Sequence, residues 1–212
     1  SAPLPCPPST YTDVPQQGSC FPCPAGYHCP SEATQVPLPC PRGSFCATGV
    51  AVPTPCPRGS FNPWEGASGV GNCSACTPGM YCQSNGLTAP EGACEAGYYC
   101  SGGATVGTPI GEATGGRCLA GHFCPPGSHT PIPCPRGSYA DAEGTPAVGQ
   151  CKSCSSSRHC EEGGLIAPGG ACEAGHFCVR GAESRVPNAS YTNLQAVEVS
   201  RDGEESQVAG RC

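Results

Sequence analysis

The residues of this chain most able to do chemistry are its 21 cysteines, about one residue in ten. Cysteine thiolates bind metals, exchange disulfides or close structural disulfides. Three CxxC pairs raise the first two possibilities: Cys20/Cys23, Cys73/Cys76 and Cys151/Cys154. A zinc site needs a second pair at suitable distance, and a thioredoxin-type site needs a βαβ context. Here the following cysteines come as C-x5-C and no histidine has ligand spacing, so structural disulfides are the favoured interpretation.

The elements that must position these cysteines cannot form an ordinary hydrophobic core. Leu, Ile, Val and Phe together make up about 12% of the chain, below the roughly 20% of a globular domain. Glycine and proline are abundant, at 31 and 26 residues. A compact enzyme with one large core is therefore excluded, and a disulfide-built chain or a disordered one remains. So many thiols favour an oxidising, extracellular location.

The charge pattern excludes several further classes. Ten basic and 16 acidic residues give a net charge of −6. Lys152 is the single lysine and no basic cluster exists, so we expect no nucleic-acid partner. No apolar run has the roughly 20 residues of a spanning helix. No GxSxG, HExxH, P-loop or EF-hand motif is present, so we expect no enzyme activity, cofactor or metal.

The strongest pattern is an internal repeat. Residues 55–100 match residues 133–178, with all six cysteines at a constant offset of 78, and a shorter copy begins at Cys6. We therefore predict three cysteine-rich repeats. They span residues 1–54, residues 55–132 with an extra cysteine pair, and residues 133–212 with a long insert at 179–211, truncated within the repeat.

One cysteine is left over. Cys212 matches Cys118, whose companion Cys124 lies six residues later. We therefore expect the companion of Cys212 just beyond the given residues, in a longer repetitive protein. The alternative is a bond from Cys212 to another chain.

A smaller unit, Cys-x-x-Gly-x-aromatic and a closing cysteine, underlies the repeat. A single module closed by a short or a long loop predicts sequential pairing. The expected pairs are Cys6–Cys20, Cys23–Cys29, Cys40–Cys46, Cys56–Cys73, Cys76–Cys82, Cys94–Cys100, Cys118–Cys124, Cys134–Cys151, Cys154–Cys160 and Cys172–Cys178. An interlaced pattern, with Cys23–Cys40 and Cys29–Cys46, stays open because sequence does not fix connectivity.

Aromatic residues recur in these modules, and we expect them to pack on a disulfide and a neighbouring proline. They are Tyr27, Phe45, Phe61, Tyr81, Tyr99, Phe123, Tyr139 and Phe177. The histidines in such slots have no partner at ligand or general-base spacing. The Pro-, Thr- and Gly-rich spacers are expected to run extended, near polyproline II, as stiff connectors. They are residues 31–39, 47–55, 101–117 and 125–133.

The motif C-P-R-G-S-Y/F followed by C-x-x-C, at Cys56–Cys76 and Cys134–Cys154, resembles the growth-factor-receptor cysteine-rich superfamily, with its EGF-like disulfide architecture. More narrowly it is similar to ephrin-receptor-like and tumour-necrosis-factor-receptor-like repeats. The resemblance covers most of the chain to about residue 178 and implies the pairs Cys56–Cys73 and Cys134–Cys151. After the CxxC the chain departs from the receptor spacing, so no receptor ligand site is implied. Such arrays occur in adhesion ectodomains and in cell-surface fibres.

Two glycosylation motifs are present, at Asn72 and Asn188, and Asn188 is the better candidate because it lies in the open insert. Ser and Thr in the spacers are candidates for O-linked glycans. Within the insert, Tyr191–Val199 can form a strand that precedes a turn at Asp202-Gly203; a solvated loop is the alternative.

We expect an elongated array of small disulfide modules with short β-hairpins and little other regular structure. The first functional hypothesis is a glycosylated extracellular structural protein, part of a surface fibre, filament or matrix that self-associates. The second is a receptor or adhesion ectodomain that binds a protein ligand. A third, weaker hypothesis, a secreted protease inhibitor, lacks a singular reactive loop in the repeats.

Overall fold

The glycine of each Cys-x-x-Gly unit lies in a left-handed turn that reverses the chain, and in every such unit before Cys172 this turn opens a short β-hairpin. Gly43, for example, has a φ of 76°, a conformation that residues with a Cβ rarely adopt. The two residues that follow form β5 (Ser44–Phe45), which pairs antiparallel with β6 (Thr54–Pro55). Since strands of two residues bury almost nothing, other interactions must hold each hairpin in place.

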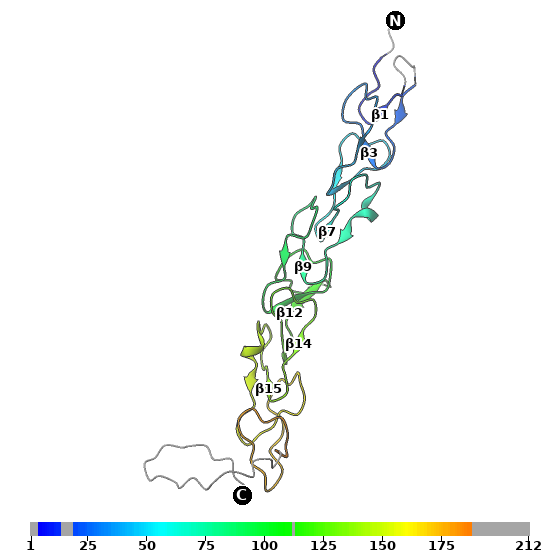
Figure 1. Ribbon diagram of the computed structural model, residues 1–212. Helices are drawn as coiled ribbons and strands as arrows, with labels where there is room; N and C mark the ends of the chain where they lie inside the picture. Colours follow the sequence, from blue (N-terminus) through cyan, green and yellow to red (C-terminus); the bar gives the residue numbers. More distant parts are fainter. Residues whose placement is uncertain (1–3, 14–18, 112, 188–212) are drawn as a thin grey trace. The chain divides into compact units, whose positions relative to one another are not determined.

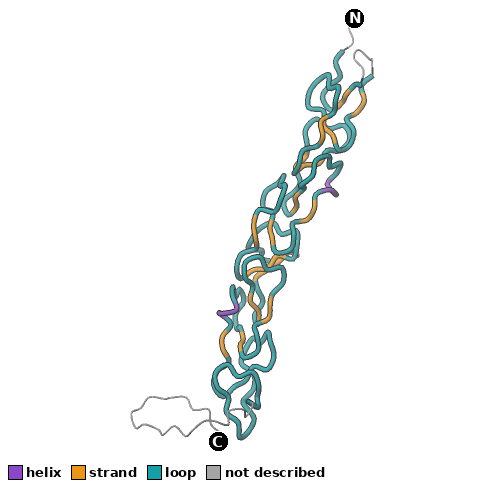
Figure 2. Tube along the Cα trace, viewed as in Figure 1, coloured by secondary structure: helices purple, strands orange, loops and turns teal. Residues whose placement is uncertain are grey.

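The computed structural model describes residues 4–13, 19–111 and 113–187. Within them the predicted fold class is confirmed: the chain is a small disulfide-rich repeat array in which loops dominate and strands are short (Figures 1 and 2). The remaining strands are β1 (Thr10–Tyr11), β2 (Phe21–Pro22), β3 (Tyr27–His28), β4 (Leu38–Pro39), β7 (Ser60–Phe61), β8 (Ser74–Ala75), β9 (Met80–Tyr81), β10 (Gly92–Ala93), β11 (Tyr98–Cys100), β12 (Gly115–Arg117), β13 (His122–Phe123), β14 (Ile132–Pro133), β15 (Ser138–Tyr139) and β16 (Lys152–Ser153). Two 3₁₀ helices are η1 (Val70–Asn72) and η2 (Val148–Gln150). Every sheet has two strands and joins elements that are neighbours in sequence.

Ten disulfides cross-link the described cysteines, from Cys6–Cys20 to Cys172–Cys178. They follow the sequential order that the module spacing predicts, and not the interlaced one. The Cα atoms of each pair lie 5.6–6.0 Å apart, a normal disulfide separation. Each disulfide therefore closes one module, and we name each module by its first cysteine.

The chain divides into two units that interleave in sequence. One comprises Ser1–Glu95, Tyr99–Gly116 and Gly127–His129, and the other comprises Ala96–Tyr98, Arg117–Pro126 and Thr130–Cys212. Both are built from the same kind of module.

Consecutive modules are joined by a fixed set of four backbone hydrogen bonds. In the Cys40 and Cys56 modules, the Cys56 N–H donates to Gly43 O and the Gly43 N–H donates to Asn62 O, both at 2.8 Å. The Cys46 N–H donates to Ala67 O at 2.9 Å, and the Gly66 N–H donates to Cys40 O at 2.8 Å. The same four bonds recur for every consecutive pair of described modules, and each bond lies within a single unit. Backbone hydrogen bonds therefore provide the repeated contact between modules.

A second left-handed turn follows the closing position in every module from Cys23 to Cys154, and it explains the spacing of many glycines. Gly66 and Gly103 hold this place in their modules, with φ of 78° and 70°. The carbonyl of Gly103 lies over Gly59, two modules earlier, where an added Cβ would come within 2.6 Å of the oxygen. Gly137 faces Gly181 at the same 2.6 Å. The glycine of the Cys-x-x-Gly turn is thus required for two reasons, its positive φ and this close approach.

The buried side chains are almost all cysteines, joined by small residues. Cys40, Cys46 and Cys56 are fully buried, and Ala67 and Ala104 lie beside such cysteines. The sulfur atoms therefore take the place that aliphatic side chains hold in an ordinary domain, as the low Leu, Ile, Val and Phe content requires.

The pairing register of the hairpins shows that Tyr27 does not occupy the aromatic position of its module. Phe45 lies opposite Thr54 across its hairpin, and His28 lies at the equivalent place opposite Leu38. Tyr27 instead precedes that slot and is 43% exposed. His159 fills the slot in the Cys154 module, and its buried Nδ1 has no hydrogen-bond partner in the described chain. The slot thus accepts imidazole as well as benzene rings.

The prediction of extended spacers was wrong. Each spacer contains the second left-handed turn, for instance Gly49 with a φ of 73°, and then returns as the second strand of the hairpin. The turn is required because its N–H bonds the preceding module, as the Gly49 N–H does to Cys23 O at 2.7 Å. The spacers are therefore parts of the modules, and not connectors between them.

The insert begins later than the sequence suggested. The Glu173 N–H donates to Arg185 O at 3.1 Å, just as the Glu95 N–H donates to Gly107 O at 2.9 Å. These pairs are offset by the repeat length of 78 residues. Residues 179–187 therefore belong to the repeated fold. The predicted strand Tyr191–Val199, the sequon at Asn188 and the odd cysteine Cys212 lie outside the described residues.

Candidate functional site: the two long-loop modules

Three modules lack a cysteine at the position that normally closes the module, six residues after the first one. Thr12, Asn62 and Ala140 stand there instead, and they are buried like the cysteines they replace, at 8%, 1% and 3% exposure. The disulfide partner is moved further along the chain, so that the sequence separation of the bond rises from 6 to 14 or 17 residues. The extra residues form long loops, and the loops at 62–73 and 140–151 are the main departures from the common module.

The two longest loops share one backbone framework. Each is an excursion of a hairpin, β7–β8 or β15–β16, and each ends in a 3₁₀ helix, η1 or η2. A serine hydroxyl braces the first turn of both modules, since Ser60 Oγ and Ser138 Oγ donate to a proline carbonyl at 2.6 Å. The disulfides Cys56–Cys73 and Cys134–Cys151 close the loops with equal sequence separation. The side chains, and not the backbone, therefore distinguish them.

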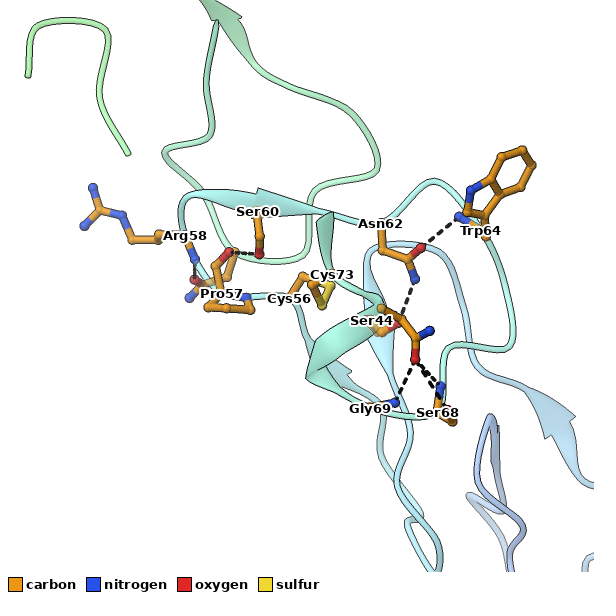
Figure 3. The surroundings of a disulfide bond; sticks show 12 residues. Ser44, Cys56, Pro57, Arg58, Ser60, Asn62, Trp64, Ser68, Gly69 and Cys73 are labelled. Carbon is orange, nitrogen blue, oxygen red and sulfur yellow. Dashed lines mark hydrogen bonds between the residues drawn. A yellow bond between two sulfur atoms is a disulfide. The ribbon is translucent and has the colours of Figure 1, made fainter. Parts of the chain in front are cut away.

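In the Cys56 module the buried Asn62 amide organises the loop. Its Nδ2 donates to Ser44 O of the preceding module at 3.2 Å, and its Oδ1 accepts from the Trp64 N–H at 3.1 Å. Figure 3 shows this amide between the two backbone groups, with the Trp64 indole directed away from the disulfide. Trp64 is 73% exposed and is the only tryptophan of the chain. In the Cys134 module, Ala140 and Ala142 take the places of Asn62 and Trp64.

The charges near the two loops also differ. Arg42 Nε lies 3.8 Å from Glu65 Oε1, which joins the Trp64 loop to the preceding module. In the Cys134 module, Lys152 Nζ donates to Asp141 Oδ2 at 2.7 Å within the loop itself. This bond lowers the pKa of Asp141 and raises the pKa of Lys152. Both pairs are exposed, so each contributes little to stability.

A third electrostatic contact fixes a short loop beside the Trp64 module. The Glu91 carboxylate accepts from Ser84 Oγ at 2.8 Å, from the Ser84 N–H at 2.9 Å and from the Gln83 N–H. These bonds hold the pKa of Glu91 below its ordinary value of 4.5, with the Ser84 hydroxyl as the largest cause. The carboxylate therefore acts as an external brace for the loop that follows Cys82.

The predicted glycosylation residue Asn72 ends the 3₁₀ helix η1. Its Oδ1 accepts from the Ser68 N–H at 3.1 Å and from the Gly69 N–H at 3.2 Å, as the dashed bonds from Ser68 and Gly69 in Figure 3 show. The residue is exposed, and its Nδ2, the atom to which a glycan attaches, takes no part in these bonds. The side chain can thus brace the loop through Oδ1 while Nδ2 stays free of these bonds.

The cysteines of the three CxxC pairs lie in separate disulfides. Cys73 is bonded to Cys56, for example, and Cys76 to Cys82. These sulfurs are therefore not available as thiolate ligands or nucleophiles. No group of three or more His, Cys, Asp or Glu side chains in the described residues is placed to hold a metal ion.

Comparison with known proteins identifies no family. No protein-family model matches the chain, and no curated protein is significantly similar to it. In the described part of the chain, no helix is long and apolar enough to cross a membrane.

Trp64 is conspicuous in the sequence as the single tryptophan, whereas nothing of that kind marks Asn62. Asn62 aligns with Ala140 in the repeat. Neither position carries a residue type that would indicate a ligand site or a catalytic role. The clue in the sequence is position: both stand six residues after a module's first cysteine, where a cysteine closes the short-loop modules. A polar residue at a place reserved for a buried sulfur indicates a dedicated hydrogen-bonding role.

Proposed function

We propose that this chain is a non-enzymatic segment of an extracellular structural protein, part of a glycosylated surface fibre, filament or matrix that self-associates. The ten disulfides fit an oxidising compartment. The observation that carries the proposal is the four-bond set that joins each module to the next. This set uses backbone donors and acceptors, turn glycines and cysteines to hold each module to its neighbours. Such nearest-neighbour contacts are typical of an extended repeat protein.

Glycans are part of the same proposal. Asn72 is exposed and its Nδ2 is directed away from its own loop bonds, while Asn188 and the spacer Ser and Thr residues are the other candidates. Peptide mapping of native material under non-reducing conditions tests this together with the disulfides. Unmodified Asn72 and Asn188 would contradict the glycan part, and many free thiols or stoichiometric zinc would contradict the extracellular assignment.

The alternative is a receptor or adhesion ectodomain that binds a protein ligand. Trp64 is the observation that favours it, because one exposed indole on an otherwise repeated surface is typical of a binding hot spot.

Negative-stain electron microscopy of native, unreduced material separates the two hypotheses. Regular filaments with an axial repeat support the structural function. Dispersed monomers at high protein concentration contradict it, and a search for a soluble or cell-surface ligand then becomes the test of the alternative.

A further inference from the structure

The backbone that carries the exposed indole of Trp64 is anchored to the preceding module. The Trp64 backbone N–H is bonded to a side chain that is 1% exposed, Asn62, and that side chain is bonded in turn to Ser44 of the preceding module. A buried amide costs free energy unless both of its ends are bonded, and Ala140 shows that alanine fills the same position without that cost. The amide thus serves the loop that carries Trp64, and because this backbone is already ordered, docking of the ring costs little backbone conformational entropy.

Exposed apolar side chains elsewhere on the chain mark where such a ring can dock. Val36 and Val52 are 75% and 76% exposed, and Leu38 is 47% exposed. They lie in the equivalent segments Val36-Pro-Leu-Pro39 and Val52-Pro-Thr-Pro55, and a third segment, Thr130-Pro-Ile-Pro133, recurs further along the chain. We call these three segments the proline segments.

The proline segments suit an aromatic partner chemically. Proline fixes its own φ, so these surfaces lose little conformational freedom on binding, and aromatic side chains are the usual partners of proline-rich strands. No charged residue occurs between residues 33 and 41 or between residues 47 and 57. The segments themselves therefore present no ionised group that docking of an indole would desolvate.

We propose that Trp64 of one molecule docks on a proline segment of a second copy of this chain. The inference rests on the proposed structural function and names the contact by which the chain self-associates. The two surfaces are different, so the contact either repeats head to tail, in rings or open filaments, or occurs twice across a two-fold axis. One indole buries only about 150–250 Å², far less than the roughly 1,200 Å² of a stable interface, so Trp64 is one anchor within a wider contact between the two copies.

The test uses the oxidised full chain and the fluorescence of its single tryptophan. As protein concentration rises, the emission maximum of Trp64 should shift to shorter wavelength and acrylamide quenching should fall, together with an increase in sedimentation coefficient. W64A should weaken association by on the order of tenfold, and W64F less. Association in which Trp64 stays fully quenchable, or association that W64A leaves unchanged, overturns the proposal.

A mixing experiment tests whether Trp64 and the proline segments are the two complementary surfaces. The triple variant V36Q/V52Q/I132Q keeps Trp64 but disrupts the three proline segments without changing the net charge, and W64A keeps the segments but has no tryptophan emission. Each should associate poorly alone. When they are mixed, Trp64 of the triple variant should shift to shorter wavelength and become protected from acrylamide, because it docks on intact segments of W64A.

The matched control changes exposed apolar residues outside the proline segments. I110Q/I166Q replaces residues that are 69% and 62% exposed and should associate like the native chain. Equal loss in this control and in the triple variant would overturn the proposal by showing a nonspecific apolar effect. No response on mixing would also overturn it, and a Trp64 response to neutral oligosaccharides instead would assign the ring to a glycan.

The outcomes also separate this contact from the function on which it rests. Filaments that persist in W64A overturn the Trp64 contact but leave the structural function standing. If the native chain forms no assembly at any concentration, both fail.

Discussion

The loops of the Cys56 and Cys134 modules share one backbone framework, and they differ at the buried position six residues after the first cysteine. In the first, Asn62 bonds the preceding module and the Trp64 backbone; in the second, Ala140 fills the space and makes no side-chain hydrogen bond. Both loops nevertheless end in a 3₁₀ helix and close with a disulfide of equal span. The comparison teaches that the disulfide and the backbone bonds fix the path of the loop, whereas the buried amide fixes what the loop presents.

The largest predicted effects lie in the framework that both modules share. Gly59→Ala and Gly137→Ala each place a Cβ 2.6 Å from a carbonyl oxygen, of Gly103 and Gly181 respectively, at a positive φ. We expect a loss of about 4 kcal/mol in unfolding free energy in either module, from backbone strain and overpacking together. Local stability is measured by native-state hydrogen exchange, since an array of modules need not unfold in one step.

Gly66→Ala is the matched control for this prediction. Gly66 also has a positive φ, of 78°, but no atom lies within 4 Å of an added Cβ. It should therefore cost only the strain of the left-handed backbone, about 1–2 kcal/mol. Equal losses at Gly59 and Gly66 would show that the close approach of the modules contributes nothing.

The next largest effects come from removing the loop disulfides. C56A/C73A and C134A/C151A each open a loop with a sequence separation of 17 residues, and we expect each to lose about 3 kcal/mol. The loops should then behave differently, because Asn62 still ties the first one to Ser44 and Trp64. Hydrogen exchange should show amide protection remaining near Trp64 and disappearing near Ala142. Equal fraying of both loops would contradict the role given to Asn62.

These framework features differ in how far the sequence predicts them. The cysteine spacing predicts the modules, the sequential disulfides and the short hairpins, because a disulfide needs a short Cα separation and a turn to reach it. The sequence does not predict the second turn. Glycines such as Gly49, Gly86 and Gly164 occupy it, but their spacing is irregular because the loops between them vary in length. The extended-spacer prediction failed for that reason: proline content indicates stiffness but not the turn within each spacer.

The candidate site was less predictable than the fold. Trp64 stands out in the sequence as the single tryptophan, but sequence alone does not say whether it is buried. The function of Asn62 depends on Ser44, which lies in another module and approaches only because the backbone bonds set the stacking register. Such a contact has no local sequence signature.

Asn62→Ala gives the loop of the Cys56 module the residue that the Cys134 module has at this position, Ala140. Alanine at this position packs well in the Cys134 module, so the fold should survive, but Ser44 O and the Trp64 N–H lose their partner. We expect about 1–2 kcal/mol less local stability and faster depolarisation of Trp64 fluorescence. Asn62→Asp is the control, since its carboxylate accepts from Trp64 but cannot donate to Ser44. If Asn62→Ala leaves the motion of Trp64 unchanged, the disulfide alone positions the ring.

The smallest predicted effect contrasts a loop held from inside by Asn62 with one held from outside by Glu91. The pKa of Glu91 lies below its ordinary value of 4.5 because of the Ser84 hydroxyl and the backbone N–H groups it accepts from. The unfolded chain therefore binds this proton more readily than the folded chain. The stabilisation by Glu91 is then complete above about pH 4.5 and is lost as pH falls through the lower folded pKa.

Thermal unfolding of the native chain and of E91Q between about pH 6 and about pH 3 tests this prediction. The difference in unfolding temperature between the two proteins should shrink as the pH falls. A difference that stays constant over this range would mean that Glu91 braces its loop by shape alone, whereas the internal brace at Asn62, which does not titrate, should act equally at every pH.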